Sequence, residues 1–188
     1  MREKLKIVPR CENLMPFIDK QHPFQSVCEY FGFNLEKGQL KRSEVVRKVL
    51  RNPDGGEVPV YFELYGYKKL QKAVSRSLTA SRSAGEFKNI SFFHELGIPA
   101  CELIAQGEFR NAFGIITNCM IITKEVIGTQ QLDLFIKDLE ASDTPEDVRK
   151  DLRQQIIEST AANLRKIHAK KFFHEDLKWR NILVRREG

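Results

Sequence analysis

The alternation of apolar and polar residues predicts a β-hairpin in the first half of the chain. Two runs rich in β-branched and aromatic residues, Ser43–Leu50 and Val58–Tyr65, flank the turn sequence Asn52-Pro53-Asp54-Gly55-Gly56. Turn residues between two such runs are typical of antiparallel strands joined by a tight turn. The preceding segment, residues 1–30, is interrupted by three prolines, and we expect it to be an irregular N-terminal extension.

The second of these strands has two chemically different faces. Successive side chains of a strand point to opposite sides of a sheet. Val60, Phe62 and Leu64 therefore share one face, and Glu63 belongs to the other. We expect the apolar face to pack against a core and Glu63 to face a cleft or solvent.

The rest of the chain alternates between helical and strand patterns. Apolar residues recur at helical spacing from Ser81 to Leu96, and a capped helical pattern runs from Thr144 to Ala169. The apolar runs Cys101–Gly107 and Gly114–Thr123 predict two further strands. This order predicts an α+β fold, in which a small antiparallel sheet with one helix is followed by a helical part.

The composition is that of a folded globular protein. Of 188 residues, 41% are hydrophobic and 30% are charged, which suits a packed core and excludes a disordered or collagen-like chain. No stretch approaches the roughly 20 apolar residues that span a bilayer, and residues 1–6 lack the apolar core of a signal peptide. We therefore expect a cytoplasmic protein. The four cysteines form no C-x-x-C pair, so reduced thiols are expected rather than a zinc site.

The chain is basic, with 31 Lys and Arg against 25 Asp and Glu and a formal net charge of +6. Positive charge is concentrated in Lys41–Arg51, Lys68–Lys88 and Arg165–Arg186. Such patches favour a polyanionic partner, which leaves nucleic acid, a phosphorylated glycolipid, an anionic membrane and a nucleotide open. A solvated basic surface without a partner is the alternative.

The segment after the long helix carries the strongest chemical signal in the chain. His174, Asp176 and Asn181 follow the order H-x-D-L-x-x-x-N and precede an apolar run, Ile182–Val184, which predicts a short strand. This spacing is typical of the catalytic loop of phosphotransferases. The alternative is an ordinary loop between a helix and a strand, in which His174 makes a structural hydrogen bond.

Each residue type of this motif suits one step of phosphate transfer. The carboxylate of Asp176 is a candidate base that orients the attacking hydroxyl and accepts its proton. The amide oxygen of Asn181 is a candidate magnesium ligand, because magnesium prefers oxygen donors. Lys178 is close enough in sequence to reach a phosphate oxygen and to neutralise the charge that develops there.

Further segments make the chain similar to one family of kinases. They are Arg42–Arg47, Val60–Tyr65, Glu86-Phe87, Gly97-Ile98-Pro99, Ile167-His168 and His174–Leu177. With these segments the chain resembles the lipopolysaccharide core kinase family (the Kdo/WaaP/InaA type) of the protein-kinase-like superfamily, over roughly residues 30 to 184. The resemblance implies a kinase-like N-lobe over residues 31–126, after the extension of residues 1–30. It also implies the beginning of a helical C-lobe, with the catalytic loop, over residues 127–188.

The resemblance also implies an activity and a nucleotide site. The enzymes of this family transfer the γ-phosphate of ATP, with Mg2+, to a sugar hydroxyl of the lipopolysaccharide inner core. Glu86 matches the helix acid that pairs with a nucleotide-binding lysine, and we expect it to point toward Glu63, which stands at the position of that lysine. Lys124 and Val126 fall in the segment that matches the hinge, whose backbone meets adenine. Lys69, six residues after Glu63, is too distant along an extended strand to replace the lysine.

The implied partners are a nucleotide and the lipopolysaccharide core or another sugar acceptor, with a peripheral contact at the anionic inner face of the inner membrane and no nucleic acid. Two alternatives remain open. The first is a non-catalytic or truncated module with a kinase fold. Glu63 favours it, and so does the absence, up to Gly188, of the second magnesium aspartate that the family carries. The second is a small-molecule phosphotransferase of the antibiotic-kinase type, which shares the catalytic-loop pattern.

Overall fold

The computed structural model describes residues 1–35, 43–67, 69–173 and 177–185. The chain divides into two compact units. The first unit comprises Met1–His94 and Pro99–Glu125, and the second comprises Glu95–Ile98 and Val126–Gly188. In the described residues, no helix combines the length and the apolar character needed to cross a membrane.

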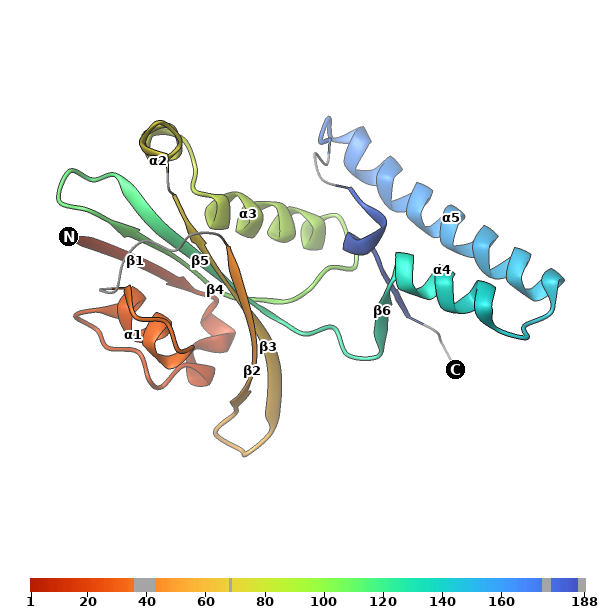
Figure 1. The fold of residues 1–188 in the computed structure, drawn as a ribbon, viewed down its shortest axis with the longest axis horizontal. Helices are drawn as coiled ribbons and strands as arrows, with labels where there is room; N and C mark the ends of the chain where they lie inside the picture. The colour runs from red at the N-terminus through yellow and green to blue at the C-terminus, as the bar shows by residue number, and fades with distance from the viewer. Residues whose placement is uncertain (36–42, 68, 174–176, 186–188) are drawn as a thin grey trace. The chain divides into compact units, whose positions relative to one another are not determined.

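The first unit is built on a five-stranded antiparallel sheet with the strand order β1-β4-β5-β3-β2 (Figure 1). The strands are β1 (Arg2–Ile7), β2 (Glu44–Arg51), β3 (Glu57–Gly66), β4 (Leu103–Arg110) and β5 (Ile116–Lys124). The strands expected from the apolar runs are therefore present, with bounds shifted by one to three residues.

The β2–β3 hairpin confirms the strongest local prediction. The N–H of Asn52 donates to the carbonyl of Gly56 at 2.8 Å, and the N–H of Gly56 donates to Asp54 Oδ1 at 3.0 Å. Gly55 has a φ of 86°, which lies in the left-handed region that glycine enters without steric cost. The turn chemistry of this segment thus joins the two strands as the sequence predicts.

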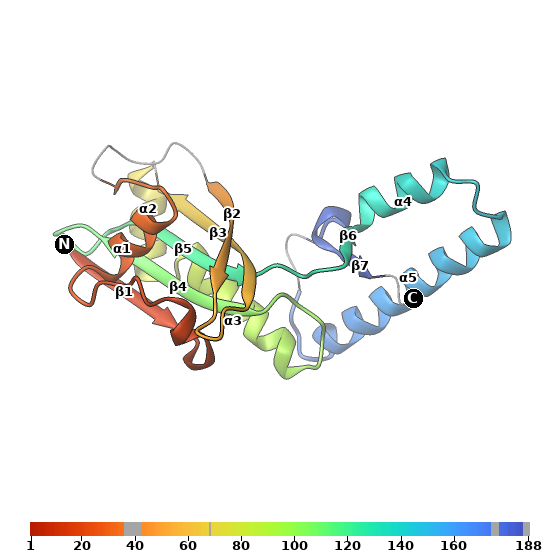
Figure 2. The same cartoon turned by 90° about the horizontal axis from the view of Figure 1, so that it is seen from below.

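The two faces of β3 pack into different cores. Val60, Phe62 and Leu64 are fully buried in a cluster that includes residues of α1 (Pro23–Tyr30). Tyr65 belongs to a second cluster, against which Phe87 of α3 (Arg82–Glu95) packs. Figures 1 and 2 show α1 and α3 on opposite sides of the sheet. Because α3 covers the face to which Glu63 belongs, Glu63 lies beside this helix.

The structure corrects the expectation that residues 1–30 form an irregular extension. β1 pairs with β4 over six residue pairs, and it is followed by a 3-10 helix, η1 (Pro9–Leu14), and by α1. Pro9 and Pro23 occupy the first turns of these helices, where a missing N–H costs no hydrogen bond. The prolines therefore begin helices in this segment, although they suggested irregular structure in the sequence.

The expectation of one helix beside the sheet is also wrong. The first unit contains α1 and α2 (Leu70–Leu78) in addition to α3. Both additional helices are short, with eight and nine residues, so their apolar repeats span little more than two turns. Such repeats are too brief to stand out in a sequence.

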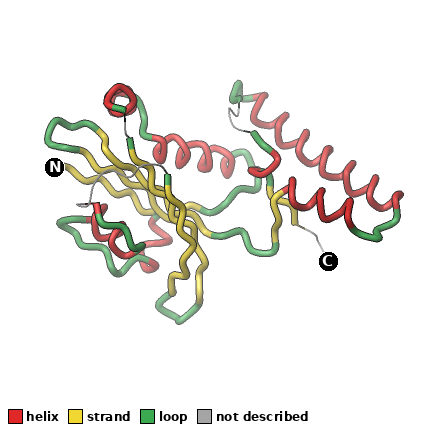
Figure 3. The backbone as a smooth tube through the Cα atoms, viewed as in Figure 1, coloured by secondary structure: helices red, strands yellow, loops and turns green. Residues whose placement is uncertain are grey.

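The second unit is mainly helical (Figure 3). It contains α4 (Leu132–Ala141) and α5 (Glu146–Ala169), and the latter confirms the predicted long helix. Two short antiparallel strands, β6 (Thr129–Gln131) and β7 (Leu183–Arg185), pair with each other, and η3 (Trp179–Asn181) precedes β7. The short strand expected after the catalytic-loop motif is thus present as β7.

Candidate functional site

β3 and the first two turns of α3 bring four polar side chains together in the first unit. We call this group the β3–α3 cluster. It consists of Glu63 and Tyr65 from β3 and of Arg82 and Glu86 from α3. Because Glu63 and Tyr65 are two residues apart on one strand, both side chains point to the face that α3 covers.

The hydroxyl of Tyr65 joins the two carboxylates of the cluster. It lies 2.5 Å from Oε2 of Glu63 and 2.9 Å from Oε2 of Glu86. A tyrosine hydroxyl has one proton, so it donates to one of these carboxylates at a time. The expectation that Glu86 points toward Glu63 is therefore confirmed, with Tyr65 between them.

Arg82 supplies the positive charge of the cluster. Its Nε atom donates to Oε1 of Glu86 at 3.0 Å, and its guanidinium carbon lies 4.3 Å from the centre of the Tyr65 ring. This residue was not predicted from the sequence. The signal that could have found it is the spacing of four residues between Arg82 and Glu86, which places both side chains on one side of a helix.

Two serines fix the start of α3 on the sheet. The hydroxyl of Ser81 accepts the N–H of Ala84 at 3.1 Å, as a residue that caps a helix does. The hydroxyl of Ser83, which is fully buried, donates to the carbonyl of Gly107 in β4 at 3.2 Å. These bonds hold the start of the helix against the sheet, and they thereby position Arg82 and, one turn further on, Glu86.

The surroundings of the cluster keep the Tyr65 hydroxyl and the Cys101 thiol protonated. Burial raises the pKa of Tyr65, and the charge of Glu86 and the bond to Glu63 raise it further. Burial likewise raises the pKa of the Cys101 thiol, to which the charges of Glu63 and Glu86 add. Tyr65 is therefore a protonated donor at neutral pH, and Cys101 is a thiol.

The charge of the cluster does not fit the phosphates of a nucleotide. Glu63 and Glu86 contribute two negative charges and Arg82 one positive charge, so the cluster is net negative when both acids are ionised. Coulomb repulsion then opposes a polyphosphate at this position. Lys69, exposed directly before α2, makes no hydrogen bond or ion pair with the cluster among the described residues, and Lys68 lies outside them. The cation that the kinase pattern expects on β3 is replaced by a carboxylate.

The segment expected to form the hinge lies where the two units divide, between Glu125 and Val126. The N–H of Lys124 donates to the carbonyl of Glu102 at 2.8 Å, and its ammonium lies 2.8 Å from the Glu102 carboxylate. The N–H of Glu125 donates to the carbonyl of Pro59 at 2.9 Å. These two backbone donors are therefore already used inside the first unit.

The catalytic-loop motif is only partly described. His174 and Asp176 lie outside the described residues. Lys178 and Asn181 are exposed, and the N–H of Asn181 donates to the carbonyl of Lys178 at 2.8 Å within the tight turn of η3. The N–H of Leu132 donates to the carbonyl of Ile182 at 2.9 Å, which ties the end of the motif to the start of α4.

The described residues alone do not provide enough ligands to hold a magnesium ion. Asn181 offers one amide oxygen, and no group of three or more His, Cys, Asp or Glu residues lies close enough together in the described part of the chain to hold a metal ion. Magnesium needs near-octahedral oxygen coordination, in which protein carboxylates usually take part.

Removing the Tyr65 hydroxyl tests the structural role of the cluster. We expect Tyr65→Phe to lower the free energy of unfolding at pH 7 by about 1–3 kcal/mol, because two partly buried carboxylates lose their shared donor. The raised pKa of Tyr65 stabilises the folded chain below the ordinary tyrosine value of about 10 and loses this effect as the pH rises above it. The variant should therefore lose less stability than the wild type between pH 9 and pH 11, as measured by urea unfolding.

The matched control for this prediction is Tyr61→Phe on the same strand. The Tyr61 hydroxyl lies 3.2 Å from Glu125 in a more exposed setting, so its removal should cost less. Equal losses for the two variants at pH 7 would contradict a special role for Tyr65.

The comparisons with known proteins agree with the sequence pattern. Residues 34–188 match the lipopolysaccharide kinase (Kdo/WaaP) family, whereas no curated protein matches the chain. A solved structure, "WaaP in complex with acyl carrier protein", is similar with 20% sequence identity and a TM-score of 0.41. That match covers 76% of this chain and 48% of the solved chain, so the present chain spans about half of its length. Because the family match covers most of the sequence, the chain belongs to the lipopolysaccharide kinase (Kdo/WaaP) family.

Proposed function

We propose that the chain is part of an ATP-dependent phosphotransferase of the lipopolysaccharide kinase type, which transfers phosphate to a sugar hydroxyl of the lipopolysaccharide inner core. The observation that carries the proposal is the family match over residues 34–188, which includes the whole catalytic-loop motif. We further propose a protein-kinase-like arrangement, with residues 31–126 in the N-lobe and residues 127–188 in the C-lobe, and a cytoplasmic location at the inner face of the inner membrane.

The chemistry proposed for this chain rests on its own side chains. Asp176 orients the acceptor hydroxyl and takes its proton, and Lys178 neutralises a phosphate oxygen as charge develops on it. Asn181 would offer an amide oxygen to a magnesium ion, whose contribution when bound would be to neutralise phosphate charge. The exposure of Lys178 and Asn181 beside the tight turn of η3 supports their access to a substrate.

The nucleotide site is proposed to differ from the usual kinase pattern. Glu63 and Glu86 lie on the two sides of the Tyr65 hydroxyl, and Arg82 is their positively charged neighbour. Lys124 and Val126 are proposed to lie beside the base. Because the Lys124 N–H already bonds to Glu102, Val126 is the residue proposed to donate its backbone N–H to the base. Because the cluster is net negative, we expect ATP to bind weakly and transfer to be slow.

Asp176→Asn tests the proposed base. Phosphate transfer from labelled ATP to purified lipopolysaccharide core should fall by about 100- to 10,000-fold, the range that a general base contributes. Asp147→Asn, at an exposed acid in the first turn of α5, is the control and should transfer phosphate at the wild-type rate. Transfer that survives in Asp176→Asn would rule out the assignment of Asp176 as the base.

A second candidate function is a non-catalytic module with a kinase fold. The observation that favours it is the hydrogen-bonded contact of both carboxylates with Tyr65, at the place where a lysine should face phosphate. This candidate predicts no transfer by the wild-type chain to lipopolysaccharide core or to aminoglycoside acceptors, which also tests the antibiotic-kinase alternative.

A further inference from the structure

α2 is attached to the sheet by its small residues and turns its large apolar residues outward. Ala73 is 4% exposed, and the hydroxyl of Ser77 accepts the N–H of Ile116 in β5 at 2.8 Å. In contrast, Leu70 and Leu78 are 68% and 82% exposed, and Val74 lies between them on the surface. A surface helix of a globular protein normally buries its large apolar face.

The outward residues form one continuous stripe. Leu70, Val74 and Leu78 follow each other at intervals of four residues, so they lie within one side of the helix. They line a shallow, open concavity on the surface of the first unit. We call these three residues the α2 stripe.

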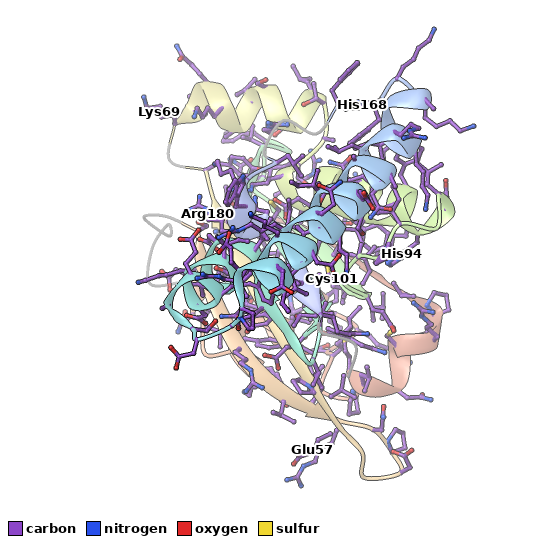
Figure 4. All side chains as sticks on the ribbon, turned by 90° about the vertical axis from the view of Figure 1, so that its right-hand side faces the viewer. Glu57, Lys69, His94, Cys101, His168 and Arg180 are labelled. Carbon is purple, nitrogen blue, oxygen red and sulfur yellow. The ribbon has the colours of Figure 1, made fainter. Side chains whose placement is uncertain are left out.

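The opposite side of α2 is positively charged. Lys69, Lys72 and Arg76 are exposed, and no acidic residue occurs between Tyr67 and Gly85. Lys72 and Arg76 are each two residues from their neighbours in the stripe, which places them about 200° around the helix. No ion pair of Lys69, Lys72 or Arg76 is found among the described residues. Figure 4 shows Lys69 at the start of this helix.

A second exposed apolar residue lies at the same end of the sheet. Phe113 is 88% exposed in the turn between β4 and β5. The side chain of Asn111 holds this turn, because its Oδ1 accepts the N–H groups of Phe113 and Ile115 at 3.0 Å each. Ile116, which bonds to Ser77 of α2, follows the turn directly. The turn therefore presents Phe113 close to the helix in a defined backbone conformation.

We propose that α2 and the β4–β5 turn dock the first unit on the surface of an anionic phospholipid bilayer. A short helix with leucines on one side and Lys and Arg on the other has the composition of helices that lie in the membrane interface. The α2 stripe and Phe113 enter the boundary between headgroups and acyl chains. The cations lie within about 10 Å, the Debye length at 0.1 M salt, of the anionic headgroups. The open shape of the surface suits a bilayer better than the defined outline of a protein partner.

The inference deepens the proposed function, on whose location at the inner membrane it rests, by assigning the surface of the chain that meets that membrane. The test is co-sedimentation of the chain with vesicles of phosphatidylglycerol and phosphatidylcholine, which requires no turnover. We expect Leu70→Ser/Leu78→Ser to lower the affinity for these vesicles more than tenfold. The variant loses the free energy that two leucine side chains gain when they leave water for the bilayer. The control is Val148→Ser/Ile157→Ser, at two exposed apolar positions of α5, which should bind as the wild type does.

A second experiment tests the contribution of positive charge to vesicle binding. Lys69→Gln/Lys72→Gln should lower binding to phosphatidylglycerol vesicles several-fold at low salt, and 0.5 M NaCl should remove that difference. Pure phosphatidylcholine vesicles should bind the wild type at least tenfold more weakly.

Wild-type binding by the leucine variant would overturn the proposal. So would loss of self-association in that variant, seen by light scattering, because the stripe would then be a contact between copies. Thermal unfolding of each variant verifies that it is folded, and transfer to a delipidated, water-soluble acceptor separates membrane docking from catalysis.

Discussion

Replacing Glu63 by lysine is expected to tighten ATP binding about ten- to hundredfold, which corresponds to about 1.4–2.8 kcal/mol. The substitution changes the ionised β3–α3 cluster from a net negative to a net positive group. Glu63 and Glu86 contact the same Tyr65 hydroxyl, so an ammonium at position 63 can reach the Glu86 carboxylate. This arrangement would form the ion pair of a strand lysine and a helix acid that kinases use to position phosphates. Isothermal titration calorimetry with ATP measures the change.

The control for this prediction is Glu57→Lys at the other end of the same strand. Glu57 carries an exposed side chain next to the β2–β3 turn, far along the strand from the end where Lys69 follows (Figure 4). The Glu57→Lys substitution makes the same change of net charge, but position 57 does not contact the cluster. If both variants tighten ATP binding equally, the effect comes from the overall charge, and the assignment of the cluster to the nucleotide site is wrong.

Replacing Phe62 by alanine is expected to lower the free energy of unfolding by about 3–5 kcal/mol. Phe62 is fully buried in the core between the sheet and α1. Its ring stacks on Phe31 with a centroid distance of 4.4 Å and on Phe33 at 5.5 Å. Removal of the ring leaves a cavity and deprives both neighbours of their partner. Urea unfolding followed by circular dichroism measures the loss, which is a large part of the roughly 5–15 kcal/mol of a typical domain.

Val45→Ala on β2 is the matched control. Val45 is 56% exposed on the neighbouring strand, so we expect its truncation to change stability by less than about 1 kcal/mol. A loss of less than 1 kcal/mol in Phe62→Ala would mean that the segment of α1 and Phe31 does not seal this core.

The proposed catalytic loop was the easiest functional candidate to identify in the sequence, because it is a local motif. Asp176, Lys178 and Asn181 lie within six residues, so their spacing alone indicated phosphotransfer chemistry. The β3–α3 cluster was harder. Glu63 and Glu86 could be paired only through the family resemblance. Tyr65 and Arg82 had no motif to mark them, since their role depends on the packing of a helix on a strand.

The elements whose signals are local could be predicted from the sequence. The hairpin followed from the turn around Gly55, the alternation of β3 placed Phe62 and Glu63 on opposite faces, and the long periodic pattern of α5 predicted its helix. In each case the residues that carry the signal are neighbours in the chain. Turn geometry and side-chain periodicity therefore decide the result before any tertiary contact forms.

The place of the N-terminus and the orientation of α2 depend on tertiary contacts instead. β1 pairs with β4 about a hundred residues away, as in the pair of Leu5 with Gly107, and nothing in its six residues reveals this partner. Gly107 has room for that strand and for Phe24 only because it lacks a Cβ, which would lie 2.8 Å from the Phe24 ring. α2 likewise has a side with large apolar residues, which predicts burial of that side. In the structure the side that carries Ala73 packs against the sheet instead. Strand pairing and close packing depend on groups that meet only in the folded chain, and this is why local patterns could not specify them.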